Sequence, residues 1–240
     1  MGVLRLIVGG ILPYVSIAVF LVAMAYRIRG WMRLPSPPMT LFPAPPPEGG
    51  AGAVNTVKEA LLFQSLYRGD RRLWIPAWGF HVVLALIFLG HVRVLSNVDR
   101  LFESLGMTEA GIQAMSGSVG GAAGVLILAA ALVLLVRRMV IPRVKEITGV
   151  ADLFALILVG AILITGNLMR FGGEHFDLTL TREYFLNLAT LRGVGDSAVL
   201  ENGVFLSHMG LAFLLLMYIP FSKILHFGGI FFTHQLIRKH

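Results

Sequence analysis

Four histidines lie within or beside apolar stretches of the chain, and their type and spacing could support metal chemistry. His81 and His91 lie in the run IPAWGFHVVLALIFLGHV, while His208 and His226 lie in VFLSHMGLAFLLLMYIPFSKILHF. An imidazole in an apolar helix needs a partner, because a polar group is costly to hold there. Each imidazole can supply one axial nitrogen to a metal ion. The four histidines therefore suggest two metal centres with two nitrogen ligands each.

The metal that this pattern favours is haem iron. Haem iron accepts histidine nitrogen along its axis, and the macrocycle needs an apolar slot between helices. The chain contains no cysteine, which excludes disulfides, thiolate-bound zinc, cysteine-ligated iron–sulfur clusters and covalent CxxCH attachment. We therefore expect two non-covalently bound b haems and a membrane electron-transfer role.

The composition indicates an integral membrane protein. Of the 240 residues, 56% are apolar and only 14% are charged, whereas about a quarter of a soluble domain is charged. Five stretches have the length of about 20 residues that a helix needs to cross a bilayer. The sequence thus predicts an all-α, five-helix membrane bundle forming a single domain over 1–240, with spans over 6–28, 75–96, 115–136, 150–170 and 203–225.

The segment between the first two predicted spans is not apolar. Its first part, a connector over 34–50, is rich in proline and cannot be a helix, because proline lacks the amide donor and fixes φ. The following stretch, about 55–68, spaces its apolar residues as an amphipathic helix does, so we expect it to lie at the membrane interface.

Charge predicts the orientation of the bundle. With the N-terminus outside and the C-terminus cytoplasmic, most of the 20 Lys and Arg residues fall on the inner side, as the positive-inside rule requires. The inner basic residues are Arg27, Arg29, Arg33, Lys58, Arg68, Arg71, Arg72, Arg137, Arg138, Arg143, Lys145, Lys223, Arg238 and Lys239. The net charge of +7 is then mainly a topology signal, and we expect no nucleic-acid binding.

The same topology pairs the histidines by depth. His91 and His208 lie toward the outer face, and His81 and His226 lie toward the inner face. On ideal helices the two intervals measure about 15 Å and about 27 Å, so tilt and a kink near Pro220 must absorb roughly 10 Å. Eighteen residues make five whole turns, which predicts that His208 and His226 share one helix face.

Other interpretations of these residues stay open. The histidines could be interior residues bonded to backbone groups, or they could line a zinc or proton pathway. A pathway of that kind usually includes carboxylates within the membrane, yet Asp152, at the inner end of the fourth span, is nearly alone there. The small residues over 116–124 would let either a helix or a flat macrocycle approach the backbone closely.

Several motifs resemble one known family. They are GGAAGV at 120–125, RRMVIPRV at 137–144, AD at 151–152 and HMGLAFLLLMYIPFSKILHF at 208–227, together with the two histidine intervals. The chain resembles the respiratory nitrate reductase gamma subunit and its relatives, which are di-haem b cytochromes. Within that superfamily it looks closest to the membrane cytochrome of the Dsr sulfite-reduction complex. The heterodisulfide reductase membrane cytochrome is a further relative.

The resemblance implies a set of roles. His91 and His208 would bind an outer, distal haem b, and His81 and His226 an inner, proximal one. Menaquinone or another quinone would react beside the distal haem. Electrons would pass to or from a cytoplasmic iron–sulfur subunit of the Dsr or heterodisulfide reductase type, with further membrane and periplasmic subunits, at the inner membrane of a prokaryote.

The resemblance also admits alternatives. Quinol oxidation feeding nitrate reduction is one, and a haem-free membrane anchor is another. The chain departs from the nitrate reductase subunit in its proline-rich inner loop and in its longer outer loop over 171–202, and it has no lysine between the second and third spans.

Two arginines near the predicted outer ends of spans are candidate contacts for a haem propionate or a quinone. Arg93 ends the second span and Arg170 ends the fourth. A guanidinium stays charged and donates in a fork, which suits a carboxylate or a carbonyl. The alternative is that both side chains simply extend to the membrane interface.

Overall fold

The computed structural model describes residues 2–33, 50–173, 177–192, 194 and 197–226. Within these ranges every regular element is a helix. Five helical stretches are long and apolar enough to cross a membrane, as predicted: Val3–Arg33, Arg71–Leu95, Glu109–Val140, Val150–Phe171 and Gly203–Phe221. The first comprises α1 (Val3–Arg5), the π-helix η1 (Leu6–Ile11) and α2 (Leu12–Arg33), and the next three are α5, α7 and α9. The predicted connector over 34–50 lies outside the described residues except for Gly50.

Polar side chains begin three of these helices. Asp70 accepts a hydrogen bond from the Leu73 amide at the start of α5, and Thr108 and Asn202 cap α7 and α11 (Gly203–Tyr218) in the same way. Such caps satisfy amides that the first helical turn leaves without intrahelical acceptors.

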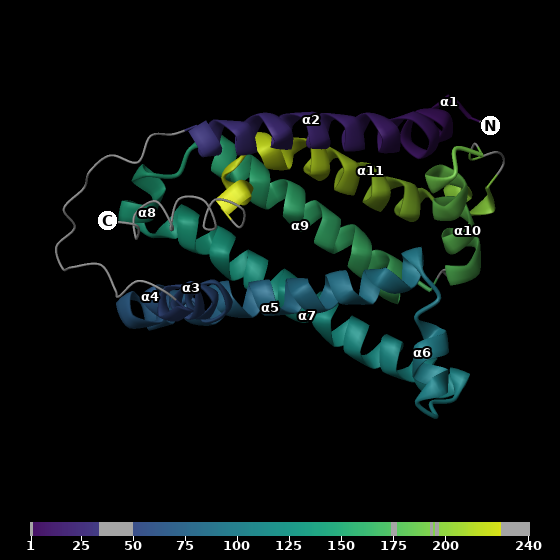
Figure 1. Ribbon diagram of the computed structural model, residues 1–240, viewed down its shortest axis with the longest axis horizontal. Coiled ribbons are helices and arrows are strands. Elements are labelled where there is room, and N and C mark those ends of the chain that lie inside the picture. The colour runs from purple at the N-terminus through teal and green to yellow at the C-terminus, as the bar shows by residue number, and fades with distance from the viewer. Residues whose placement is uncertain (1, 34–49, 174–176, 193, 195–196, 227–240) are drawn as a thin grey trace.

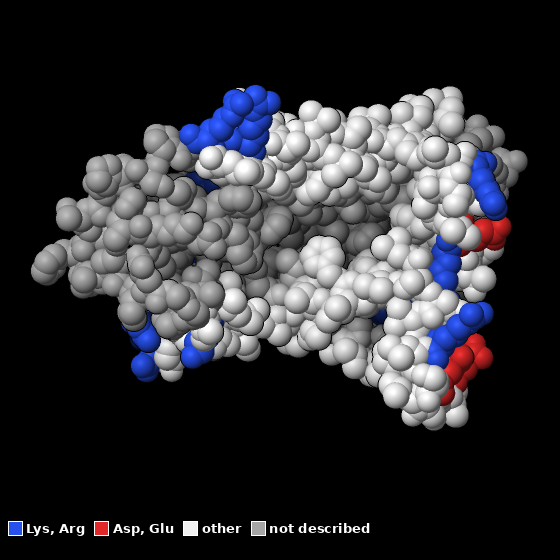
Figure 2. Space-filling view, viewed as in Figure 1, with Lys and Arg blue, Asp and Glu red and all other residues white. Residues whose placement is uncertain are grey.

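The spans lie side by side in an up-and-down bundle (Figure 1). Helix α7 packs on α5 and α9, and α11 packs on α9 and α2, whereas α5 and α11 do not pack closely on each other. The surface is hollowed between α11 and α5 (Figure 2). Consistent with this hollow, no residue of α5 is buried, although α5 is one of the five apolar spans. The hollow thus lies between the two helices that carry three of the four histidines.

The two ends of the bundle differ in charge. At the left end in Figure 1, called here the basic end, α2 and α7 end and α5 begins. The opposite end, called the α10 end, holds α6 (Asp99–Ser104), α10 (Leu178–Ala189) and the 3-10 helix η2 (Ala198–Glu201). On the face shown in Figure 2, acidic residues gather at the α10 end, basic residues lie at both ends, and the middle is almost free of charge. This pattern is typical of a membrane-embedded belt.

The predicted amphipathic helix over 55–68 is two helices in the structure. They are α3 (Gly50–Leu62) and α4 (Gln64–Gly69), separated at Phe63, whose φ is 50°. At the break, carbonyls in the last turn of α3 are free to accept other hydrogen bonds. The Trp74 indole donates to the Leu62 carbonyl at 2.8 Å, and the Trp78 indole donates to the Leu61 carbonyl at 2.9 Å. The start of α5 thus holds the broken helix in place.

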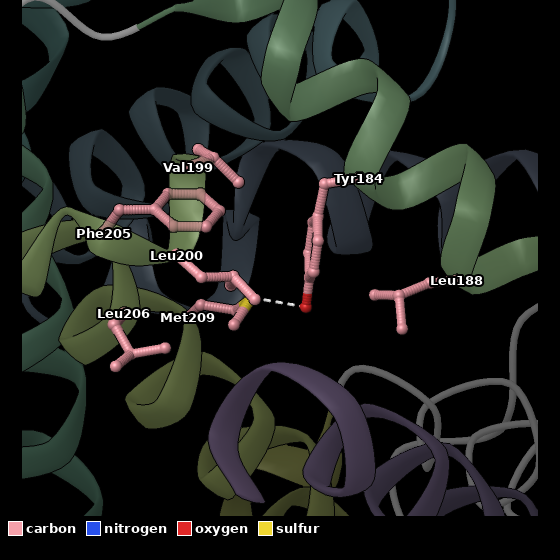
Figure 3. Close-up of a cluster of buried hydrophobic side chains, with 7 residues drawn as sticks. All are labelled: Tyr184, Leu188, Val199, Leu200, Phe205, Leu206 and Met209. Atoms are coloured by element: carbon pink, nitrogen blue, oxygen red, sulfur yellow. Dashed lines mark hydrogen bonds between the residues drawn. The ribbon is translucent and has the colours of Figure 1, made fainter. Parts of the chain in front are cut away.

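The sequence predicted a long loop over 171–202. In the structure this segment contains the helix α10 and four residues of the buried core. Seven buried residues form this cluster: Tyr184, Leu188, Val199, Leu200, Phe205, Leu206 and Met209 (Figure 3). The Tyr184 hydroxyl donates to the Gly9 carbonyl at 2.7 Å and lies 3.2 Å from Met209 Sδ. Burial raises the pKa of this hydroxyl, so it stays protonated and able to donate.

Gly9 allows this contact between η1 and the α10 end. A Cβ at position 9 would lie 2.8 Å from a methyl carbon of Leu200, so a larger residue there would require the buried Leu200 side chain to move. The segment after α9 therefore fastens the first span to α11, next to His208.

Candidate functional site

The structure brings the four histidines together in two pairs, and the pairs are those predicted from topology. The ring centres of His91 and His208 lie 6.4 Å apart with planes inclined by 17°. Those of His81 and His226 lie 5.8 Å apart with planes inclined by 84°. The first pair lies toward the α10 end, and the second pair lies toward the basic end.

The unequal sequence intervals are reconciled by a break in the fifth span. The α-helix ends at Tyr218, and two short 3-10 helices follow, η3 (Ile219–Phe221) and η4 (Lys223–Leu225). Between them Ser222 has extended backbone, with φ −115° and ψ 169°. The prediction that His208 and His226 share a face of one continuous helix was therefore wrong. The break lets His226 meet His81, a rearrangement larger than the kink expected at Pro220.

Two of the histidines are oriented by their own helix. In α5, Nδ1 of His81 lies 2.7 Å from the Ala77 carbonyl, and Nδ1 of His91 lies 2.7 Å from the Ile87 carbonyl. A carbonyl oxygen can only accept a hydrogen bond, so each Nδ1 carries the proton. The neutral ring then presents an unprotonated Nε2, the atom that a metal ion binds.

In the other two rings, different contacts place the proton on Nδ1. Nδ1 of His226 faces the Lys223 carbonyl at 3.0 Å. Nδ1 of His208 is held from α9, by the Ile162 carbonyl at 3.1 Å and the Thr165 hydroxyl oxygen at 3.0 Å. Among the described residues no hydrogen bond engages Nε2 of any of the four rings. The sequence pattern gave no sign of Thr165 or Ile162 in this role.

These distances fit one metal ion between the rings of each pair. Metal–imidazole bonds of about 2 Å, plus roughly 1 Å from each nitrogen to its ring centre, place two axial ring centres about 6 Å apart. The observed separations are 6.4 and 5.8 Å. The hollow between α11 and α5 lies in the part of this face that is almost free of charged residues (Figure 2), which suits a haem. Within the described residues no three His, Asp or Glu side chains gather as a metal-ion site.

Arg93 takes part in a cluster that joins three elements at the α10 end. Its Nε donates to Asp99 Oδ1 at 2.7 Å, and Arg182 Nη2 donates to Asp99 Oδ2 at 2.7 Å. The Arg182 Nε also donates to the Arg93 carbonyl at 2.6 Å, near the end of α5. Hydrogen bonding from Arg93 is the largest cause that lowers the pKa of Asp99. The Nη2 atom of Arg93 is buried with no partner in the described structure.

Arg170 lies apart from that cluster. Its guanidinium rests on α7, where a Cβ at Gly120 would lie 2.6 Å from Nη2, and it forms no ion pair with another described residue. Asn167 similarly donates to the Gly124 carbonyl at 3.0 Å, and its Oδ1 is buried with no partner in the described ranges. Gly120, Gly121 and Gly124 thus leave room for side chains of α9. This agrees with the alternative that the small residues over 116–124 let another helix approach.

Comparison with known proteins assigns the chain to a family. A model of the nitrate reductase gamma subunit family matches residues 64–239, a range that includes all four histidines. The chain belongs to this family. With five spans of sufficient length and apolarity, it is a multi-pass membrane protein.

Two archaeal proteins and one bacterial protein are similar to it. The Hdr-like menaquinol oxidoreductase cytochrome b-like subunit of Archaeoglobus fulgidus is 32% identical, over 95% of this chain and 78% of the relative. The protein of the same description from Archaeoglobus profundus is 26% identical, over 92% of this chain and 76% of the relative. The respiratory nitrate reductase 1 gamma chain of Escherichia coli is 30% identical, over 63% of this chain and 69% of the relative.

Proposed function

We propose that the chain is a di-haem b membrane subunit that carries electrons between a quinone and a partner protein. The observation that supports this proposal most directly is the pair of histidine pairs. Each has a ring separation suited to one metal ion, and each ring has its proton on Nδ1. The names of the relatives, which describe cytochrome b-like and nitrate reductase gamma subunits, support the coarser electron-transfer role.

In this proposal each bound haem supplies one-electron chemistry at its iron. The four histidines would supply the nitrogen ligands, and carbonyl acceptors on α5 and α9 and at Lys223 fix the orientation of their rings. Hydrogen bonds of this kind hold the ring in one tautomer and increase the basicity of its Nε2.

We infer an orientation with the basic end in the cytoplasm and the N-terminus outside. The positive-inside rule supports it, because Arg27, Arg137 and Arg143 lie at the basic end. His91 and His208 would then be the distal ligands and His81 and His226 the proximal ligands. Arg93 Nη2, which has no partner among the described residues, and the guanidinium of Arg170 are available at the α10 end to contact a propionate or a quinone carbonyl.

We propose menaquinone as the quinone and a cytoplasmic iron–sulfur subunit of the Dsr or heterodisulfide reductase type as the partner, in the inner membrane of a prokaryote. The name of the Archaeoglobus fulgidus relative supports menaquinol, and the similarity to that relative covers 95% of the chain. A role as a nitrate reductase gamma subunit has narrower support, because the similarity to the Escherichia coli protein covers 63%. The partner would dock at the basic end.

The test is haem quantification in the purified, detergent-solubilised protein. A pyridine haemochrome assay with a reduced-minus-oxidised spectrum is expected to give about two b haems per chain. His91→Ala and His226→Ala should each lower this to about one, because each removes an axial ligand. His234→Ala, a histidine outside both pairs, is the control and should keep both haems. A folded protein with no haem would overturn the proposal and favour a transporter or an anchor.

A further inference from the structure

His226 differs from the other three histidines in what holds its backbone. His81, His91 and His208 each lie inside a long α-helix. His226 instead follows the short 3-10 helix η4, after the extended residue Ser222. Side-chain position in a regular helix is determined by the helix itself, but in an irregular segment it must be determined by other contacts.

Three contacts fasten the segment before His226 to the rest of the bundle. Arg27 Nε donates to the Pro220 carbonyl at 3.0 Å, and the Tyr218 hydroxyl donates to the Ala151 carbonyl at 3.1 Å. The third is an ion pair in which Lys223 Nζ donates to Asp152 Oδ2 at 2.8 Å. The first contact comes from α2 and the other two from the first turn of α9.

Asp152 is a rigid anchor for this pair. Its side chain is 6% exposed. Its Oδ2 also accepts a hydrogen bond from the Gly149 amide at 3.1 Å, and this bond caps the start of α9. Hydrogen bonds from Gly149 and Lys223 therefore hold the carboxylate at the start of α9. The positive end of the helix dipole stabilises its charge as well.

Lys223 connects this anchor to the ring of His226. Its ammonium binds Asp152, and its carbonyl oxygen accepts from His226 Nδ1 at 3.0 Å. One residue thus links the fixed carboxylate at the start of α9 to the ring that faces His81. The Lys223 side chain is 80% exposed, so the pair contributes little to global stability. The ion pair instead affects the position of the His226 ring.

We propose that Asp152 and Lys223 are positioning residues that hold His226 in place as an iron ligand opposite His81. This proposal rests on the proposed di-haem function. It predicts that breaking the ion pair affects the proximal haem and leaves the distal haem, bound by His91 and His208, unchanged. Loss of a residue that orients a metal ligand typically weakens binding about 10- to 100-fold.

The experiment compares Asp152→Asn, Lys223→Gln, the exchanged pair D152K/K223D and Lys223→Arg in the full-length protein. Haem content, redox titration and electron paramagnetic resonance are the readouts, and the signal lost in His226→Ala identifies the proximal haem. We expect Lys223→Gln and Asp152→Asn to release the proximal haem at least about 10-fold more readily, or to shift its titration and resonance. Lys223→Arg should retain both haems.

Controls separate this proposal from the one on which it rests. Glu201→Gln breaks the exposed pair with Arg5, 3.0 Å apart at the opposite end, and should leave both haems unchanged. Asp152→Asn also alters the cap of α9, so if that variant fails to fold, Lys223→Gln decides the question, because it leaves the cap intact. Wild-type protein with two haems and a Lys223→Gln variant identical to it would overturn the positioning role alone. Wild-type protein without haem would overturn the proposed function.

Discussion

The hydrogen bond between Thr165 and His208 gives a sharp prediction about the distal centre. His208 is the one member of the two pairs whose Nδ1 contacts a side chain among the described residues, at 3.0 Å from Thr165 Oγ1. The hydroxyl itself donates to the Ala161 carbonyl at 2.9 Å, so it accepts from the imidazole. Thr165→Val removes this acceptor and changes the side-chain volume little. The Ile162 carbonyl, 3.1 Å from the same Nδ1, remains.

The size of the effect follows from the energy of one hydrogen bond. A net hydrogen bond contributes about 0.5–1.5 kcal/mol, and only the part that differs between the two oxidation states moves the potential. For one electron, 59 mV corresponds to a tenfold change in equilibrium constant, which is about 1.4 kcal/mol. The highest value of about 1.5 kcal/mol therefore sets an upper bound of roughly 65 mV. The acceptor makes the imidazole a more basic ligand, which favours ferric iron. Its loss should therefore raise the distal potential by up to about 65 mV.

The assay is a potentiometric titration of both haems in Thr165→Val and in a matched control. Thr190→Val is suitable, because the Thr190 hydroxyl donates to the Leu186 carbonyl of its own helix at 2.8 Å and lies on the surface. Only Thr165→Val should shift the distal haem, and neither variant should shift the proximal one. A distal potential equal to that of wild type, or a shift confined to the proximal haem, would refute the reasoning.

Two further predictions concern the α10 end. Tyr184→Phe leaves the Gly9 carbonyl without its buried donor, so we expect a loss of about 1–3 kcal/mol of stability, measured by thermal unfolding in detergent; an unchanged midpoint would contradict this. Asp99→Asn should destabilise the protein by about 1–2 kcal/mol, because the carboxylate accepts from both Arg93 and Arg182. Those bonds lower the pKa of Asp99 in the folded state below its ordinary 3.8. The difference in unfolding free energy between wild type and Asp99→Asn should therefore be full above pH 3.8 and decrease as the pH falls through the folded pKa. A difference that does not change between pH 3 and pH 6 would contradict this.

The sequence determined the parts of this protein that depend on residue type and run length. Uninterrupted apolar stretches of about 20 residues predict the spans. These spans are helices, because lipid offers no hydrogen-bond partners to the backbone and a helix pairs its own backbone groups. Histidines within those stretches mark the candidate ligands, because an imidazole there needs a partner. The alternation of span direction was sufficient to pair His91 with His208 and His81 with His226. The orientation across the membrane and the haem-ligand role stay predictions.

Some structural features had a sequence signal that was overlooked. The stretch after Asp177 has an N-cap residue followed by apolar side chains at helical spacing, which is the signature of α10. Treating 171–202 as a loop therefore missed Tyr184 and the core around it. The break of the amphipathic helix at Phe63 had no such signal, because a bulky residue rarely adopts positive φ.

Only the tertiary structure decided how His208 and His226 are held, whereas His81 and His91 are oriented by carbonyls of their own helix. The contact of Thr165 with His208 joins residues 43 positions apart, and the Lys223–Asp152 pair spans 71 positions. A residue pattern carries local information on helix period and apolarity, whereas such contacts depend on which helices pack together and where the last span breaks. The amino-acid types thus specify which residues could bind a metal. The packing of α9 against α11 and against the segment after Tyr218 specifies how the rings of His208 and His226 are held.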